Sequence, residues 1–231
     1  MGITQQIGAS SIIKPGVCTS STRPASPYEG QVIFETDTDK MLVWNGSSWV
    51  IPNSPAQNPQ ALELVTTATC SAGGTASNGI ITIGTAVTSV TVANAFSSTY
   101  DHYRIILTGG TASTSSNQFS FNFNGSPSAW YGNFIYANFA GSTPASVGYN
   151  NLTGVTHAAS VSSGYSQAFI DIQSPFLATP SFFSSHFVDG SNAGRTQATN
   201  ANSTSYTGFI LTMNTGTCSG GTIAIYGYRK S

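Results

Sequence analysis

A chain of 231 residues is long enough for one large all-β domain or for two small ones. Only 6% of the residues are charged, against roughly 25% in an ordinary globular protein, and the formal net charge is −1. With no basic excess and no run of roughly 18 apolar residues, the sequence predicts no nucleic-acid partner and no insertion into a membrane. Weak charge repulsion favours a place inside an assembly over a concentrated free monomer.

The apolar residues favour strands over helices. Ile and Val outnumber Leu, and the chain holds 13 Phe and 10 Tyr. Branched and aromatic side chains suit the pleated, half-buried surface of a sheet. We therefore predict an all-β protein.

The first 29 residues show neither strand nor helix periodicity and carry Pro15, Pro24 and Pro27. We predict an extended arm here. Because free arms are usually disordered unless something ties them down, we expect a partner surface to order this one.

Residues 31–50 contain three short strands, QVIFET, MLVW and WV. Asp37–Lys40 joins the first two, and Asn45-Gly46 begins the turn into the third because both residues tolerate positive φ. This pattern predicts a three-stranded meander with one apolar face and little chain to bury it against. We expect another surface to complete it, from its own C-terminal domain, a sister subunit or a larger particle.

Charge is concentrated in the same region. Five of the chain's 15 charged residues (7 basic and 8 acidic) lie between positions 29 and 40: Glu29, Glu35, Asp37, Asp39 and Lys40. Such clustering predicts a docking contact, since electrostatic complementarity sets register and partner choice. The alternating carboxylates could also attract a hard cation. The loop lacks the ligand order and central glycine of an EF-hand, so a solvated turn is the favoured interpretation.

A Pro-rich segment, residues 52–61, predicts a semi-extended linker. It separates an N-terminal module, residues 1–51, from a larger domain, residues 62–231. In that domain roughly ten strands separated by Gly, Ser and Asn turns predict an antiparallel, jelly-roll-like β-sandwich. Its clearest strand alternates Phe119, Phe121 and Phe123 with polar residues, as a half-buried strand does.

Known catalytic and metal-binding motifs are missing from the sequence. The histidines and cysteines show no metal-ligand spacing. The larger domain holds too few acidic residues to favour paired-carboxylate catalysis: Glu63, Asp101, Asp171 and Asp189. We expect no enzyme activity, no cofactor and no metal. A Ser-His-Asp triad built in space and a glycan-active enzyme stay open as alternatives.

One aromatic cluster, SPSAWYGNFIY at residues 126–136, is a candidate binding site. The simpler interpretation is packing in a core or an interface. The functional interpretation is a stacking platform for sugar rings built by Trp130, Tyr131 and Tyr136, with Asn and Ser donors nearby.

Two stretches resemble proteins of tailed-bacteriophage virions. Residues 23–50 are similar to a short virion module with an Arg-Pro (Arg23-Pro24), a Gly-Gln before an apolar strand (Gly30-Gln31), a Glu-Thr-Asp tip (Glu35-Thr36-Asp37) and a Trp-x-Gly-x-x-Trp end (Trp44 to Trp49). The strands YDHYRIILTGG and GGTIAIYGYRKS resemble β-sandwich domains of tail-fibre and related virion-fibre proteins.

The resemblance implies a non-enzymatic structural protein on the tail or capsid surface of a virion, usually a homotrimer. Residues 1–51 would dock on other virion proteins, with Arg23, Glu35, Asp37, Asp39, Trp44 and Trp49 as the anchoring residues. The sandwich would face outward to bind a host receptor or surface glycan. The alternative is a capsid or collar decoration protein with no receptor role.

Overall fold

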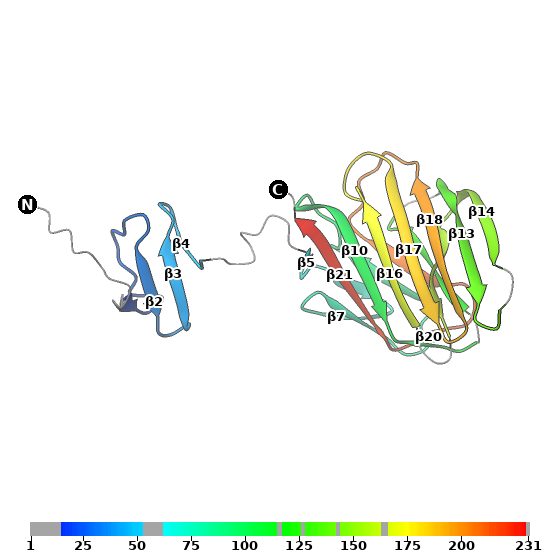
Figure 1. Cartoon of the computed structure of the whole chain (residues 1–231), viewed down its shortest axis with the longest axis horizontal. Coiled ribbons are helices and arrows are strands. Elements are labelled where there is room, and N and C mark those ends of the chain that lie inside the picture. The colour runs from blue at the N-terminus through cyan, green and yellow to red at the C-terminus, as the bar shows by residue number, and fades with distance from the viewer. Residues whose placement is uncertain are drawn as a thin grey trace, which may run out of the picture. The chain divides into compact units, whose positions relative to one another are not determined.

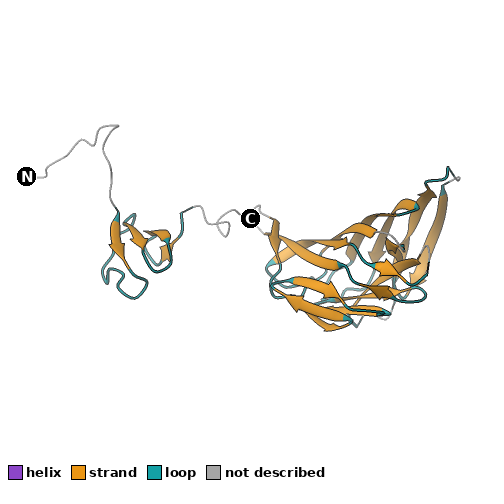
Figure 2. Ribbon diagram, turned by 90° about the horizontal axis from the view of Figure 1, so that it is seen from below, coloured by secondary structure: helices purple, strands orange, loops and turns teal. Residues whose placement is uncertain are grey.

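Strands build both units of this chain, and the described residues contain no helix (Figures 1 and 2). The computed structural model describes residues 15–52, 62–114, 117–125, 128–141, 144–162 and 166–229. The chain divides between Pro59 and Gln60, inside the segment predicted as a linker. Residues 1–14 of the predicted arm and 53–61 of the linker lie outside the described residues. No described helix has the length and apolarity needed to span a membrane.

The N-terminal unit is a four-stranded sheet. Its order is β1 (Gly16–Cys18), β2 (Val32–Glu35), β3 (Lys40–Trp44) and β4 (Trp49–Val50). Strands β2, β3 and β4 form the predicted antiparallel meander. Strand β1 adds a fourth member, parallel to β2.

The predicted extended arm is therefore wrong for residues 15–29, which contacts within the chain hold in place. Strand β1 pairs with β2, and the next turn is fixed where the backbone N–H of Ser20 donates to Asp37 Oδ1 at 2.9 Å. Arg23 then donates from Nε to the carboxylate of Glu35. Sequence periodicity could not reveal β1 because a three-residue strand is too short to alternate.

The turn between β3 and β4 forms where Asn45-Gly46 predicted it, by a different mechanism. Gly46 has a φ of +94°, whereas Asn45 is not in the left-handed region. Instead, Asn45 Oδ1 accepts hydrogen bonds from the backbone N–H groups of Ser47 and Ser48, at 3.0 and 2.8 Å. Asn45 thus acts through its side chain, which mimics a backbone turn.

The C-terminal unit is an all-antiparallel β-sandwich, as the sequence predicted. In its larger sheet the strands run in the order β14 (Ala145–Leu152), β13 (Trp130–Asn138), β18 (Asn192–Asn200), β17 (Ser181–Asp189), β16 (Ser166–Gln173), β10 (Tyr100–Thr108), β21 (Thr222–Arg229), β8 (Ile80–Ile83) and β7 (Gly74–Ser77), with β5 (Leu62–Leu64) also paired to β21. Figure 1 shows β14 to β21 side by side. The second sheet runs β15 (Val155–Val161), β12 (Asn117–Phe123), β19 (Phe209–Met213), β9 (Ser89–Ala93) and β6 (Thr69–Ala72). A short pair joins β11 (Thr111–Ala112) to β20 (Cys218–Ser219).

Aromatic rings fill the space between the two sheets. Phe119, Phe121 and Phe123 are all buried, which confirms the alternation predicted for β12. Phe121 stacks on Phe209 with ring centroids 5.3 Å apart, and Trp130 of the facing sheet packs against Phe123 at 5.2 Å. The inner face of the larger sheet is thus committed to the core, and its outer face is left for other contacts.

Candidate functional site

The small sheet presents two chemically different faces. Neighbouring residues on a strand point to opposite sides, and directly paired residues share a side. Ile33 pairs with Leu42, and both side chains are buried on one face. Glu35 lies on this same face and is only 1% exposed.

An ion pair between an exposed arginine and the buried Glu35 closes that face. The carboxylate of Glu35 accepts from Arg23 Nε and, at 2.8 Å, from the hydroxyl of Thr38. The hydrogen bond from Arg23 is the main cause that lowers the pKa of Glu35 below its usual value. The hydroxyl of Ser20 likewise lowers the pKa of Asp37. Both carboxylates therefore stabilise the unit from within.

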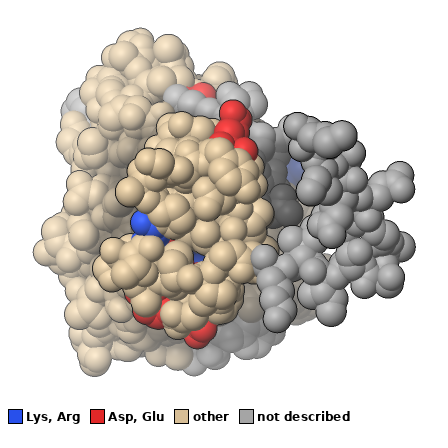
Figure 3. Space-filling model, turned by 90° about the vertical axis from the view of Figure 1, so that its left-hand side faces the viewer, with Lys and Arg blue, Asp and Glu red and all other residues tan. Residues whose placement is uncertain are grey.

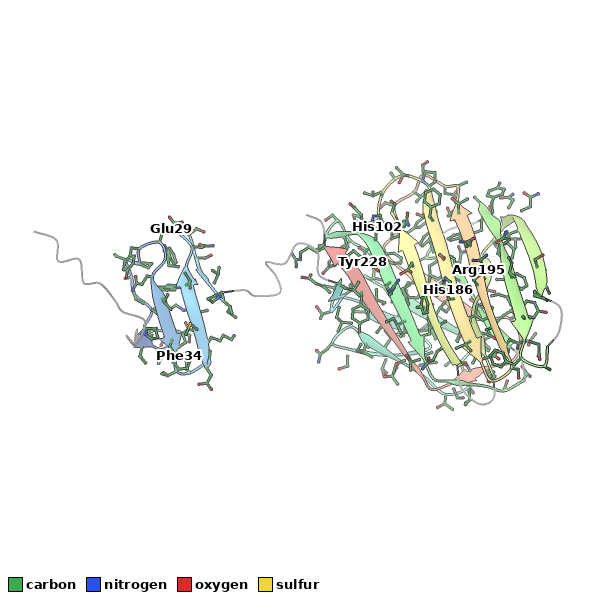
Figure 4. The ribbon with its side chains drawn as sticks, viewed as in Figure 1. Glu29, Phe34, His102, His186, Arg195 and Tyr228 are labelled. Atoms are coloured by element: carbon green, nitrogen blue, oxygen red, sulfur yellow. The ribbon has the colours of Figure 1, made fainter. Side chains whose placement is uncertain are left out.

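The opposite face of the small sheet is entirely apolar along its strands. Register places three side chains in each of two rows across the sheet: Val17, Phe34 and Met41, and Val32, Val43 and Val50. Val17 is 70% exposed and Met41 is 51% exposed. We call these six residues the apolar face. Figure 4 labels Phe34 in this unit.

The six residues predicted to anchor the chain lie elsewhere in the same unit. Arg23, Glu35 and Asp37 make the internal contacts described above, so the acidic cluster does not form one exposed strip. Asp39 sits in the β2–β3 turn with a φ of +52°. The half-buried rings of Trp44 and Trp49 pack edge to face, with centroids 5.5 Å apart. The apolar face, which sequence reasoning placed on the meander without naming its residues, is the feature that these contacts leave exposed.

In the sandwich, the outer face of the larger sheet carries three parallel rows of side chains across β16, β17 and β18. The first row is Phe169, His186 and Arg195; the second is Asp171, Ser184 and Gln197; the third is Gln173, Phe182 and Thr199, extended by Tyr131 on β13. Figure 4 labels His186 and Arg195 on adjacent strands of this sheet. Rows two residues apart are separated by about 7 Å, so the outer rows stand about 13 Å apart.

The first and third rows form the walls of a groove, and the second row forms its floor. Phe182 is 56% exposed and Phe169 is 44% exposed, whereas Ser184 and Gln197 make the floor polar. A hollow of about 410 Å³ lies over the floor and the Phe182–Tyr131 wall. A second hollow of about 460 Å³ lies beyond the Phe169–His186 wall. We call the two hollows and the wall between them the outer groove; both volumes are typical of small-ligand sites.

Two arginines lie along the outer groove, and only one of them is paired with a carboxylate of the described residues. Arg104 donates from two nitrogens to the carboxylate of Asp171, both at 2.7 Å, which neutralises the floor. Arg104 also lies over the ring of Phe169, 5.6 Å from its centroid. His186 stacks on Phe169 at 5.1 Å. Arg195 pairs with His186 across the strands, is exposed, and has no carboxylate of the described residues within 4 Å.

The predicted aromatic platform is divided between the two sides of the sheet. Trp130 is fully buried, and its indole N–H donates to Asn122 Oδ1 at 2.9 Å, so the stacking role predicted for it is wrong. Tyr131, its neighbour, points outward and lines the outer groove. Tyr136 points inward and lies 6.1 Å from the ring of His157. Sequence proximity grouped these rings, but strand alternation separates them.

A third pocket, of about 290 Å³, is lined by Tyr136 and His157, with Asn138, Asn192 and Gln118. His157 stacks on Phe134 at 3.8 Å, and burial lowers its pKa to about 4. Nearby, the carboxylate of Asp189 accepts from the hydroxyl of Ser160 and from the backbone N–H of Ser191. Because serine contacts this carboxylate directly, the arrangement differs from a Ser-His-Asp triad, in which histidine lies between the two.

One further charged cluster of the sandwich is engaged within the chain. Glu63 accepts from two nitrogens of Arg229 and from the hydroxyl of Tyr100. No three His, Cys, Asp or Glu side chains among the described residues gather as a metal site would require. In the view of Figure 3 the surface is mostly uncharged, with small areas of red and blue.

Comparisons with protein-family models, with curated proteins and with solved structures found no match for this chain. The two surfaces described above, the apolar face and the outer groove, are therefore the basis for a functional assignment.

Proposed function

We propose that this chain is a structural fibre protein of a tailed bacteriophage. Residues 1–51 would hold it on the virion, and the sandwich would be displayed for attachment to the host. The observation that carries the proposal is the apolar face of the small sheet, six apolar side chains in two adjacent rows. Contiguous exposed apolar surface marks an interaction site in an otherwise polar protein.

The division of labour between the units supports this proposal. One face of the small sheet is buried and closed by Arg23 and Glu35, whereas the apolar face is not covered. A partner surface could therefore bury the apolar face without refolding the unit. The sandwich has its own aromatic core, which leaves the outer face of its larger sheet free to carry a binding surface. The resemblance of residues 23–50 to a phage virion module supports another virion protein as the partner, and it implies a homotrimer.

Deletion of residues 1–51 tests the anchoring role. The remaining sandwich is expected to fold, to show an unchanged thermal unfolding midpoint, and to be absent from purified particles. Particles that incorporate the truncated chain at the normal level would contradict the proposal.

A point variant tests the contribution of the apolar face separately from that of the rest of the unit. Met41→Glu places a charge at the β3 end of a row and is expected to reduce incorporation strongly. Ser47→Glu adds the same charge at the exposed β3–β4 turn and is expected to leave incorporation unchanged. A label on the sandwich, located on the head or the tail of intact particles, separates tail fibre from capsid decoration.

A further inference from the structure

Arg195 differs from the other three described arginines. Arg23, Arg104 and Arg229 each bind a carboxylate of the chain, whereas Arg195 has none within 4 Å among the described residues. It lies on β18 in the row of Phe169 and His186; its neighbour Gly194 lines one hollow and Gln197 lines the other, while Arg195 stands at the surface beside both. A guanidinium in this position offers planar donors suited to a carboxylate or phosphate from outside.

A second copy of the same face does not supply the missing anion. That copy would bring Asp171, whose carboxylate already accepts from two nitrogens of Arg104, and a second unpaired Arg195. Two like charges would then meet, which disfavours self-association through this face. The charge of the outer groove therefore selects an anionic ligand of another kind.

The shape and chemistry around Arg195 fit a chain of small rings. Each hollow has the volume of a small-ligand site, and the wall that carries Arg195 lies between them. Phe182 and Tyr131 expose ring surface along one hollow, and the Ser184 hydroxyl and Gln197 amide of the floor can donate or accept hydrogen bonds. Exposed rings beside neutral polar groups suit ligands with one apolar side and many hydroxyls.

We infer that the outer groove binds an acidic polysaccharide, with Arg195 holding a sugar carboxylate and Phe182 and Tyr131 supporting the faces of neighbouring sugar rings. The inference rests on the attachment role proposed for the sandwich and names the class of its ligand. Uronic acids and sialic acids share the chemistry that it requires, a carboxylate on a hydroxylated ring.

Calorimetric titration of the full chain tests the inference directly. The probes are trigalacturonate, a sialic acid trimer, and a carboxyl-reduced counterpart of each. We expect at least one acidic probe to bind about tenfold more tightly than its reduced counterpart, because a hydrogen bond to a charged group is lost on reduction. The probe that binds identifies the source of the carboxylate. Equal affinity for each acidic probe and its reduced counterpart, or no binding of any probe, would overturn the inference.

Two variants with matched controls locate the ligand. Arg195→Gln is expected to weaken the acidic probe about tenfold and to leave the reduced probe unchanged, while Lys40→Gln, which removes an exposed cation from the other unit, changes neither. Phe182→Ala is expected to weaken both probes, whereas Phe139→Ala, equally exposed at 57%, weakens neither. Unchanged thermal unfolding midpoints establish that each variant is folded. Retained affinity in Arg195→Gln would refute the assignment.

A negative result in the titration and a negative result in the incorporation experiments refute different proposals. A chain that joins particles but binds no acidic sugar refutes only the ligand assigned here. A chain that binds acidic sugar but joins particles without residues 1–51 refutes only the anchoring role.

Discussion

The small N-terminal sheet and the C-terminal sandwich differ in how they bury the apolar side chains of their strands. The sandwich packs rings from both sheets against each other, with Phe121 at the centre of several ring contacts. The small sheet buries Ile33 and Leu42 on one side and closes that side with an ion pair. Its other side stays apolar and exposed. The difference indicates that one unit completes its own core, whereas the other depends on polar contacts and leaves an apolar surface uncovered.

The largest expected effect comes from the sandwich core. Phe121→Ala removes a fully buried ring and should lower the free energy of unfolding of the sandwich by about 3–5 kcal/mol. Urea unfolding followed by near-ultraviolet circular dichroism measures this loss. Hydrogen exchange in residues 16–50 should not change, and a change there would show that the two units share stability.

The next effect is confined to the small sheet. Arg23→Gln leaves the buried carboxylate of Glu35 without its charged partner, so we expect faster amide hydrogen exchange across β1, β2 and β3. The matched control is Arg104→Gln, which removes a half-exposed ion pair from the sandwich and should have a small effect there. Unchanged exchange in the small sheet would contradict the stabilising role of the Arg23–Glu35 pair.

A smaller effect is the pH dependence of stability, which should differ between the two units. Burial lowers the pKa of His157 to about 4, below the roughly 6.5 of an unfolded histidine, so the unfolded sandwich binds more protons as the pH falls. The stabilisation is complete above pH 6.5 and is lost as the pH falls toward 4. The corresponding loss in the small sheet belongs to Glu35 and Asp37, whose pKa values are also lowered, and starts near the unfolded carboxyl pKa of about 4.

The variant His157→Asn isolates this contribution. Asn tolerates the φ of +55° at this position and does not titrate. The variant should be less stable at pH 7, since it loses the ring contact with Phe134, yet its stability should depend less on pH between 7 and 5. Denaturant unfolding at several pH values measures the slope. An equal slope in the variant and the natural chain would assign the pH dependence to other groups.

The fold class could be predicted because alternation is strong where strands bury large residues, as in Phe119 to Phe123. Alternation could not reveal β18, because its sequence NAGRTQATN contains no large apolar residue. In the structure β18 lies inside the larger sheet, and small residues such as Ala198 face the core beside large rings from neighbouring strands. Arg195 was missed as a site residue for the same reason.

The outer groove was partly visible in the sequence SFFSSHFVD. Phenylalanines there occupy both strand faces: Phe183 and Phe187 are buried, while Phe182 is exposed on the outer groove. An apolar residue on both faces of a strand is a signal for a second contact surface. Pairing across strands, which brings Phe182 close to Tyr131, depends on register and could not be read from one sequence.

Oxidative footprinting of Met41 tests most directly whether the apolar face is the docking surface. Met41 is 51% exposed in the isolated chain, and buried Met213 of the sandwich, 6% exposed, serves as an internal reference. We predict that Met41 is oxidised rapidly in the free protein and is strongly protected on assembled particles, while Met213 is protected in both. Equal oxidation of Met41 in the free protein and on particles would contradict the account.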